Sequence, residues 1–93
     1  MNALKVLIDD EDVGATEFNL NLSCRNLRPR WRGTIMAVNK PPLKHDVVCN
    51  NIVAEMRTGD NVATVKLKVV AKAQFVIGAE RNYYQIDFEV VNG

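Results

Sequence analysis

The chain has 93 residues, of which 47% are hydrophobic and 25% are charged, and its formal net charge is +1. These values indicate one globular domain, spanning residues 1–93, and they exclude a disordered chain. No apolar run approaches the roughly 18 residues that a transmembrane helix needs, so we expect no membrane partner. Residues 1–5 lack the basic region and apolar core of a secretory signal, and we therefore expect a cytoplasmic protein.

Apolar residues alternate with polar ones from the start of the chain, which predicts strands rather than helices. Leu4, Val6 and Ile8 define a first strand that ends at the acidic stretch 9–12, and Gly14 provides a turn.

The next two predicted strands cover residues 16–24 and 31–39. The first alternates so regularly that one face is predicted to be buried; that face carries Phe18, Leu20, Leu22 and Cys24. In the second, Gly33 marks a possible bulge. Pro41 and Pro42 end this strand, because proline has no backbone N–H to donate to a neighbouring strand.

A long hairpin, residues 47–77, follows. Gly59 and Asp60 suit a two-residue type II′ turn, which needs glycine at its first central position. The resulting register pairs Thr58 with Asn61, Met56 with Ala63, Ala54 with Val65, Ile52 with Leu67, Asn50 with Val69 and Val48 with Ala71. This register makes one face almost entirely apolar, and a slip of one residue would destroy that face.

A second hairpin turns through residues 78–81. Its register pairs Ile77 with Asn82, Phe75 with Tyr84, Ala73 with Ile86, Ala71 with Phe88 and Val69 with Val90. The same register sets Lys72 opposite Asp87, a favourable cross-strand pair of charges. Residues 47–90 are therefore predicted to form a three-stranded antiparallel meander with one continuous apolar face.

Together these elements predict an all-β fold, a small antiparallel β-sandwich or flattened β-barrel of about six strands.

One predicted strand is too long for a domain of this size. Residues 62–77 span roughly 53 Å at the usual rise per residue, whereas a domain of this size is only about 30–35 Å wide. The strand must bend across both layers, break at a bulge, or project as an arm that needs a partner.

Chemistry-bearing residues are few. His45 and Asp46 are neighbours that point to opposite faces of a strand, and we predict that His45 is a solvated loop residue. Cys24 and Cys49 fit no metal-binding spacing and are predicted to be reduced, partly buried and not joined to each other. We expect no catalytic residues, no bound metal and no cofactor, and hence not an enzyme.

The charges are distributed unevenly, which is the main electrostatic feature. Residues 1–24 contain five acidic residues and one basic residue, whereas residues 25–44 contain six basic residues and no acidic one. The acidic group centres on Asp9, Asp10, Glu11 and Asp12, which lack the spacing of a calcium loop. We interpret it as a solvated loop that blunts a sheet edge, or as an acidic assembly loop.

The basic segment is the most function-like part of the sequence. Its candidate contact residues are Arg25, Arg28, Arg30, Trp31, Arg32, Lys40 and Lys44. Arginine and tryptophan dominate protein–protein hot spots, and they also bind phosphates and stack on bases in single-stranded nucleic acid. Strand alternation places Arg30 and Arg32 on the face opposite Trp31. Three interpretations remain open: a protein interface, a nucleic-acid groove, and a solvated basic edge.

The overall pattern resembles small β-rich structural proteins of tailed bacteriophages, such as capsid decoration, head–tail joining and tail proteins. The resembling features are residues 4–14, which lead into the alternating strand 16–24, and the long hairpin 47–77. The resemblance implies a virion component built in a bacterial cytoplasm, and it assigns no site residues.

From these features we predict a non-enzymatic structural protein that assembles as a homo-oligomer or with a larger viral scaffold. A small β-barrel that binds single-stranded nucleic acid through residues 25–44 is the alternative. A further alternative is a small phage inhibitor of a host defence protein.

Overall fold

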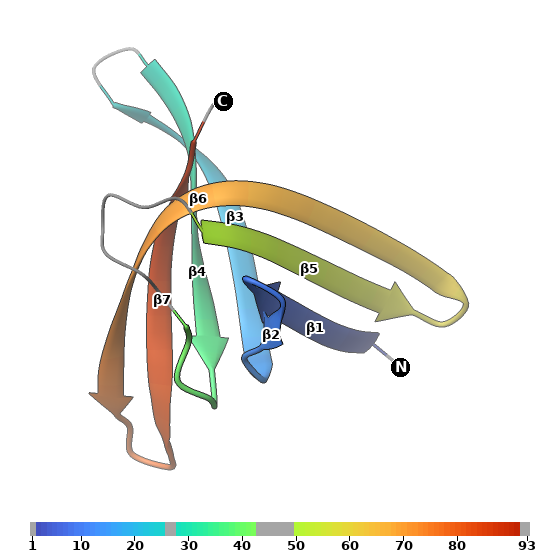
Figure 1. The fold of residues 1–93 in the computed structure, drawn as a ribbon, viewed down its shortest axis with the longest axis vertical. Coiled ribbons are helices and arrows are strands. Elements are labelled where there is room, and N and C mark those ends of the chain that lie inside the picture. The colour runs from blue at the N-terminus through green and yellow to red at the C-terminus, as the bar shows by residue number, and fades with distance from the viewer. Residues whose placement is uncertain (1, 26–27, 43–49, 92–93) are drawn as a thin grey trace.

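The computed structural model describes residues 2–25, 28–42 and 50–91. In these ranges it contains seven strands and no helix, which confirms the predicted all-β class (Figure 1). The strands are β1 (Asn2–Ile8), β2 (Glu11–Asp12), β3 (Ala15–Arg25), β4 (Arg28–Ala37), β5 (Asn50–Thr58), β6 (Asn61–Ile77) and β7 (Asn82–Val90).

All seven strands belong to one antiparallel sheet with the order β2-β1-β5-β6-β7-β4-β3. The strand beyond the predicted six is β2, a two-residue strand that pairs back onto β1. Two pairings join distant parts of the chain: β1 pairs with β5, and β4 pairs with β7. The meander β5-β6-β7 thus forms the middle of the sheet, and the N-terminal strands extend it on both sides.

The registers predicted for both hairpins are confirmed wherever the residues are described. Met56 lies opposite Ala63 in the first hairpin, and Phe75 lies opposite Tyr84 in the second. Lys72 lies opposite Asp87, as predicted. Gly59 has a φ of 61°, which agrees with the first central position of a type II′ turn. The pair predicted to join Val48 to Ala71 lies outside the described residues.

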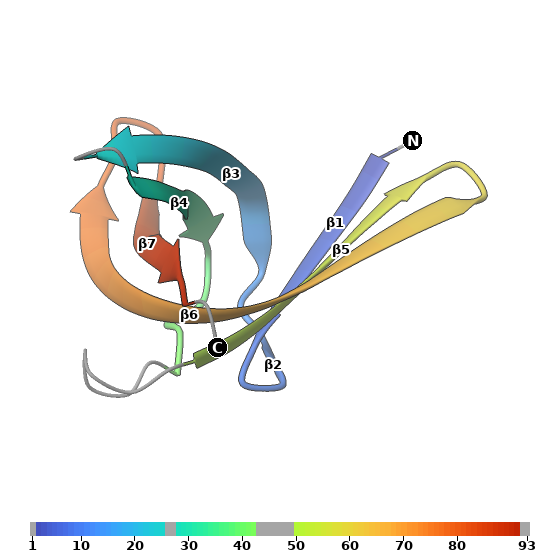
Figure 2. The same ribbon diagram turned by 90° about the horizontal axis from the view of Figure 1, so that it is seen from above.

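The seventeen-residue strand β6 both bends and projects (Figure 2). Its second half curls with β7, β4 and β3 into an incomplete ring, while its first half runs outward beside β1 and β5. We call the outward part, made of β1, β5 and residues 61–68 of β6, the arm. The second layer expected of a sandwich therefore comes from one sheet that curls over its own inner face, with β3 packing against β1.

The core lies inside this curl and draws on both ends of the sheet. Its members are Val6, Ile8, Val13, Ile35, Ala37, Ile52, Ala54, Val69, Ala71, Ile86 and Phe88. Tyr84 packs against this cluster, as predicted, but remains half-buried. The described part of the chain contains no helix long and apolar enough to cross a membrane.

Two local predictions are wrong. Gly33 is not a bulge, because it pairs regularly with Leu20 and Phe88; the register shift occurs on β3 between Ala15 and Glu17. Cys24 is exposed rather than buried, because the end of β3 extends beyond the strands that would cover it. Cys49 and His45 lie outside the described residues.

Candidate assembly surface

The acidic stretch forms the turn between β1 and β2, at one edge of the sheet. Asp9 has a structural role. Its carboxylate accepts hydrogen bonds from the Asn50 side-chain amide (2.6 Å) and from the Asn51 backbone N–H (3.0 Å). Asn50 is fully buried, so this carboxylate accepts from an NH2 group that has no access to water, whereas the Oδ1 atom of the same amide has no hydrogen-bond partner among the described residues. Of the four predicted loop residues, only Asp10, Glu11 and Asp12 are exposed.

The structure divides the predicted basic segment. Arg28, Arg30 and Arg32 lie in the first half of β4, whereas Lys40 follows the other end of that strand. The length of β4, about 30 Å at the usual rise, separates them. Lys44 and the side chain of Arg25 lie outside the described residues. The four bases whose side chains the structure describes therefore do not form one continuous groove.

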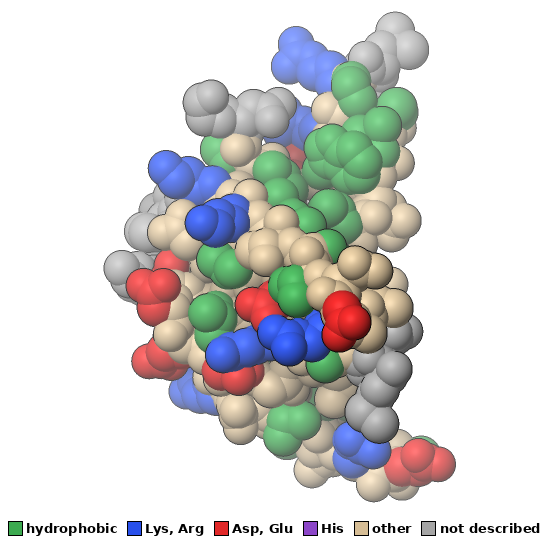
Figure 3. Space-filling view, turned by 90° about the vertical axis from the view of Figure 1, so that its right-hand side faces the viewer, with side chains coloured by type: hydrophobic (Ala, Val, Ile, Leu, Met, Phe, Trp, Pro, Cys, Tyr) green, Lys and Arg blue, Asp and Glu red, His purple; other side chains and the backbone are tan. Residues whose placement is uncertain are grey.

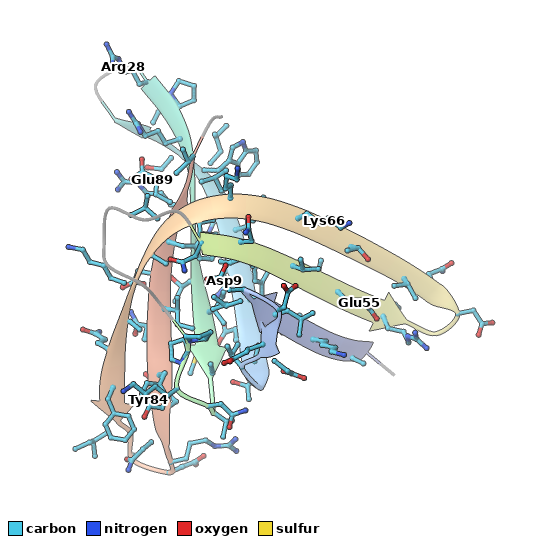
Figure 4. All side chains as sticks on the ribbon, viewed as in Figure 1. Asp9, Arg28, Glu55, Lys66, Tyr84 and Glu89 are labelled. Atoms are coloured by element: carbon cyan, nitrogen blue, oxygen red, sulfur yellow. The ribbon has the colours of Figure 1, made fainter. Side chains whose placement is uncertain are left out.

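Arg28, Arg30 and Trp31 share a cleft of about 530 Å³ with Val70, Glu89, Val90 and Val91. The cleft forms because β4 pairs with β7 only from Arg32 onward, and its first three residues extend past Val90, the last residue of β7. Arg30 donates to Glu89 at 3.0 Å, across the cleft. Figure 4 places Arg28 at the far end of the β3–β4 hairpin, away from Glu89.

The β3–β4 end also has an uncovered apolar side. Trp31 lies opposite Leu22, on the inner face of the sheet, yet these side chains are 47% and 53% exposed. Figure 3 shows hydrophobic side chains gathered at the end of the molecule where this hairpin lies. As predicted, Arg30 and Arg32 lie on the opposite face of β4 from Trp31.

Burial also falls off along the arm. On the inner face, Val69 and Ala71 of β6 are buried where the strand crosses the core, whereas Ala63 near its tip is exposed. On the neighbouring strand Met56, opposite Ala63, is 37% exposed. The outer face of the arm is polar, and Figure 4 shows Glu55 and Lys66 along it. The arm is therefore an amphipathic three-stranded sheet whose inner face is only partly covered.

A third uncovered apolar area lies at the β6–β7 end. The rings of Phe75 and Tyr84 pack at a centroid distance of 5.1 Å. Phe75 is nevertheless 54% exposed, and Ile77 beside the turn is 80% exposed.

The sequence did not predict that Leu22, Met56, Val62, Phe75 and Ile77 are exposed. Alternation assigned most of them to the face that was expected to be buried. The excessive length of residues 62–77 was the one signal that part of this face lacks cover. Among the described residues, no group of three or more His, Cys, Asp or Glu side chains has the geometry to hold a metal ion. No protein-family model and no curated protein matches the sequence.

Proposed function

We propose that this protein is a non-enzymatic assembly protein that acts through protein–protein contacts, either with copies of itself or with a larger scaffold. The virion of a tailed bacteriophage is the proposed setting, and it rests on the resemblance described above. The protein would then be synthesised in the bacterial cytoplasm and function in the particle.

The supporting observation is that apolar side chains are exposed at three separate places on one curled sheet. Its residues are Leu22 and Trp31 on the β3–β4 hairpin, Met56 and the neighbouring Ala63 on the inner face of the arm, and Phe75 and Ile77 at the β6–β7 end. Single exposed apolar residues are normal, but grouped ones mark sites of interaction. The base of the arm contributes Val6, Ile8, Ile52 and Ala54 to the core, but its tip adds nothing to that core, so a partner best explains the tip.

The charges support contacts between neighbouring copies. Exposed acidic residues lie on the β1–β2 turn, and exposed arginines lie on the β3–β4 end, a separate part of the molecule in both ribbon views. We propose that these two regions of neighbouring subunits attract each other. A contact of this head-to-tail kind closes into a ring or continues as a filament.

Binding of single-stranded nucleic acid is the second candidate, because the cleft at Arg28 and Arg30 has a half-exposed tryptophan in its wall. Two observations weigh against it. Glu89 compensates the charge of Arg30, and Lys40 lies beyond the opposite end of β4. The cleft therefore offers few uncompensated charges to a phosphate backbone.

Sedimentation velocity of the purified protein at 0.15 and 0.5 M salt, with and without a single-stranded oligonucleotide, separates the two candidates. We expect a defined oligomer that persists at the higher salt, because apolar contacts are not screened. Arg28→Glu should weaken any head-to-tail contact through repulsion by the acidic turn, while Lys40→Glu serves as a control of equal charge change. A monomer that binds the oligonucleotide tightly and loses it steeply with salt would contradict the proposal.

A further inference from the structure

The two arginines that line the cleft differ in their partners. Arg28 and Arg30 lie two residues apart on the same face of β4, so their side chains begin about 7 Å apart. Arg30 donates to the Glu89 carboxylate at 3.0 Å. In the described part of the chain, no carboxylate forms an ion pair with Arg28. The cleft therefore offers one uncompensated guanidinium and one that a carboxylate of the same chain already binds.

The bond between Arg30 and Glu89 is accessible to a competitor. The two side chains are 53% and 34% exposed, and both line the cleft. Exposed ion pairs contribute little to stability, because water and salt screen both charges and ordering two long side chains costs entropy. A second carboxylate that enters the cleft can therefore replace Glu89 as the partner of Arg30.

Glu89 has another cation to turn to when it leaves Arg30. Arg32 lies directly opposite Glu89 in the pairing of β4 with β7. The Nε atom of Arg32 is buried and has no hydrogen-bond partner among the described residues. A buried donor without a partner is unfavourable, so a carboxylate that moves from Arg30 to Arg32 leaves neither of its charges isolated. Glu89 thus lies between two arginines, of which it binds one.

The β1–β2 turn carries two carboxylates without such partners. Asp9 and Asp10, with φ of 48° and 70°, are the central residues of a two-residue turn of the type with two positive φ angles. The carboxylates of Asp9 and Asp12 accept hydrogen bonds within the chain. Asp10 and Glu11 are exposed, and no cation of the described residues forms an ion pair with either. The turn is therefore a narrow projection with two uncompensated acids.

The turn of one chain is not in place to fill the cleft of the same chain. The residues that line the cleft are different from those that surround the turn, and the two regions lie apart in both ribbon views. A second copy can bring its turn to the cleft, where two acids meet two arginines. The cleft of about 530 Å³ is of a size that holds a drug-sized molecule, and the tip of a two-residue turn is no larger.

We propose that Glu89 is an internal competitor that regulates the contact between copies. In the free chain it binds Arg30, and in the assembly the Asp10 and Glu11 carboxylates of a second copy enter the cleft and displace it. This inference rests on the proposed function and deepens it, because it names the group that must give way when two chains associate. Glu89 weakens the contact twice, since it binds Arg30 in the free chain and repels the incoming acids.

Glu89→Gln tests the competition, because glutamine keeps the shape of the side chain and removes its charge. We expect sedimentation equilibrium in low salt to show a dissociation constant for self-association at least about threefold lower than that of the wild type. The matched control is Glu55→Gln, which removes the acid of the ion pair with Arg57 on the arm. It makes the same change in net charge and should associate as the wild type does.

Two further variants test which groups exchange. In an Arg30→Gln background, Glu89→Gln should give no gain, because the arginine that it releases is absent. In a background with Asp10→Asn and Glu11→Gln, it should give no gain either, because the acids that replace Glu89 are absent. Circular dichroism checks that every variant keeps its strands. A gain that persists in either background overturns the exchange.

The outcomes separate this inference from the proposed function. An oligomer that Glu89→Gln does not strengthen overturns the competition and leaves assembly through other contacts in place. Wild type and Glu89→Gln that both remain monomeric up to about 1 mM also overturn it, and leave a larger scaffold as the partner in the proposed function. A monomer whose tight, salt-sensitive binding of a single-stranded oligonucleotide is strengthened by Glu89→Gln overturns both.

Discussion

Phe18 of β3 and Phe88 of β7 stack with their ring centroids 5.9 Å apart, although β4 lies between those two strands in the sheet. The residue of β4 that lies opposite Phe88 is Gly33. Because glycine has no side chain, the Phe88 ring covers it and reaches Phe18 on the far strand. The sequence predicted a possible bulge at Gly33. Instead, Gly33 leaves the space in which a side chain of β7 crosses β4 and contacts β3.

Gly33→Ala is therefore expected to destabilise the protein by about 1–3 kcal/mol, the usual cost of overpacking. Its added methyl group would overlap the Phe88 ring and the backbone oxygen of Asn19. Urea unfolding measures the loss. Thr34→Ala, on the outer face of the same strand, is the control and should cost less than about 1 kcal/mol. An unchanged stability for Gly33→Ala would show that the ring does not cover this position.

Asp9→Ala should cost about 1–3 kcal/mol, because it leaves the fully buried Asn50 amide without the carboxylate that accepts its hydrogen bond. Asp10→Asn is the matched control. Asp10 is exposed, and asparagine tolerates its left-handed backbone angle of 70°. Denaturant unfolding of both variants provides the comparison, and equal stabilities would contradict a structural role for Asp9.

Gly59→Ala should lower stability by about 1 kcal/mol through the backbone alone. The φ of Gly59 is 61°, and a side chain added there would meet no atom within 4 Å. Gly59→Asn should lose a similar amount, because the first central position of a type II′ turn combines a positive φ with an extended ψ, outside the left-handed helical region that asparagine tolerates. Thermal unfolding followed by circular dichroism measures both losses, and a Gly59→Ala variant as stable as the wild type would contradict the type II′ turn.

Cys24 should react readily with a thiol reagent in the folded protein, because it lies exposed at the end of β3. The readout is absorbance during reaction with a disulfide reagent under native conditions. Cys24→Ser should remove this rapid phase and leave the fold unchanged. The absence of a rapid phase in the wild-type protein would contradict the exposure of Cys24.

Trp31, the single tryptophan of the chain, reports on the nucleic-acid alternative. Because it is 47% exposed, acrylamide should quench its fluorescence in the folded protein. We expect a single-stranded oligonucleotide to leave that fluorescence unchanged, whereas stacking of a base on the ring would quench it. Denatured protein provides the fully exposed reference for acrylamide.

The sequence by itself determined the meander. Alternation assigns each residue of 50–90 to a face, and the residues of a short turn then fix which residues lie opposite one another, as Met56 with Ala63 and Phe75 with Tyr84. Both signals are local, and a strand shifted by one residue would expose an entire apolar face. The same reasoning placed Arg30 and Arg32 away from Trp31 on β4.

Only the tertiary structure decided which of these faces is covered. Leu22 and Ile86 both lie on the inner side of the sheet, yet Leu22 is 53% exposed and Ile86 is fully buried. The difference depends on where β7 ends relative to β3 and β4, and on how strongly the sheet curls. The alternation of a single strand predicts neither the end of β7 nor the curl of the sheet. Burial depends on the length and position of strands that lie far away in the sequence. For the same reason, the pairing of β1 with β5 emerges only when the whole sheet is assembled.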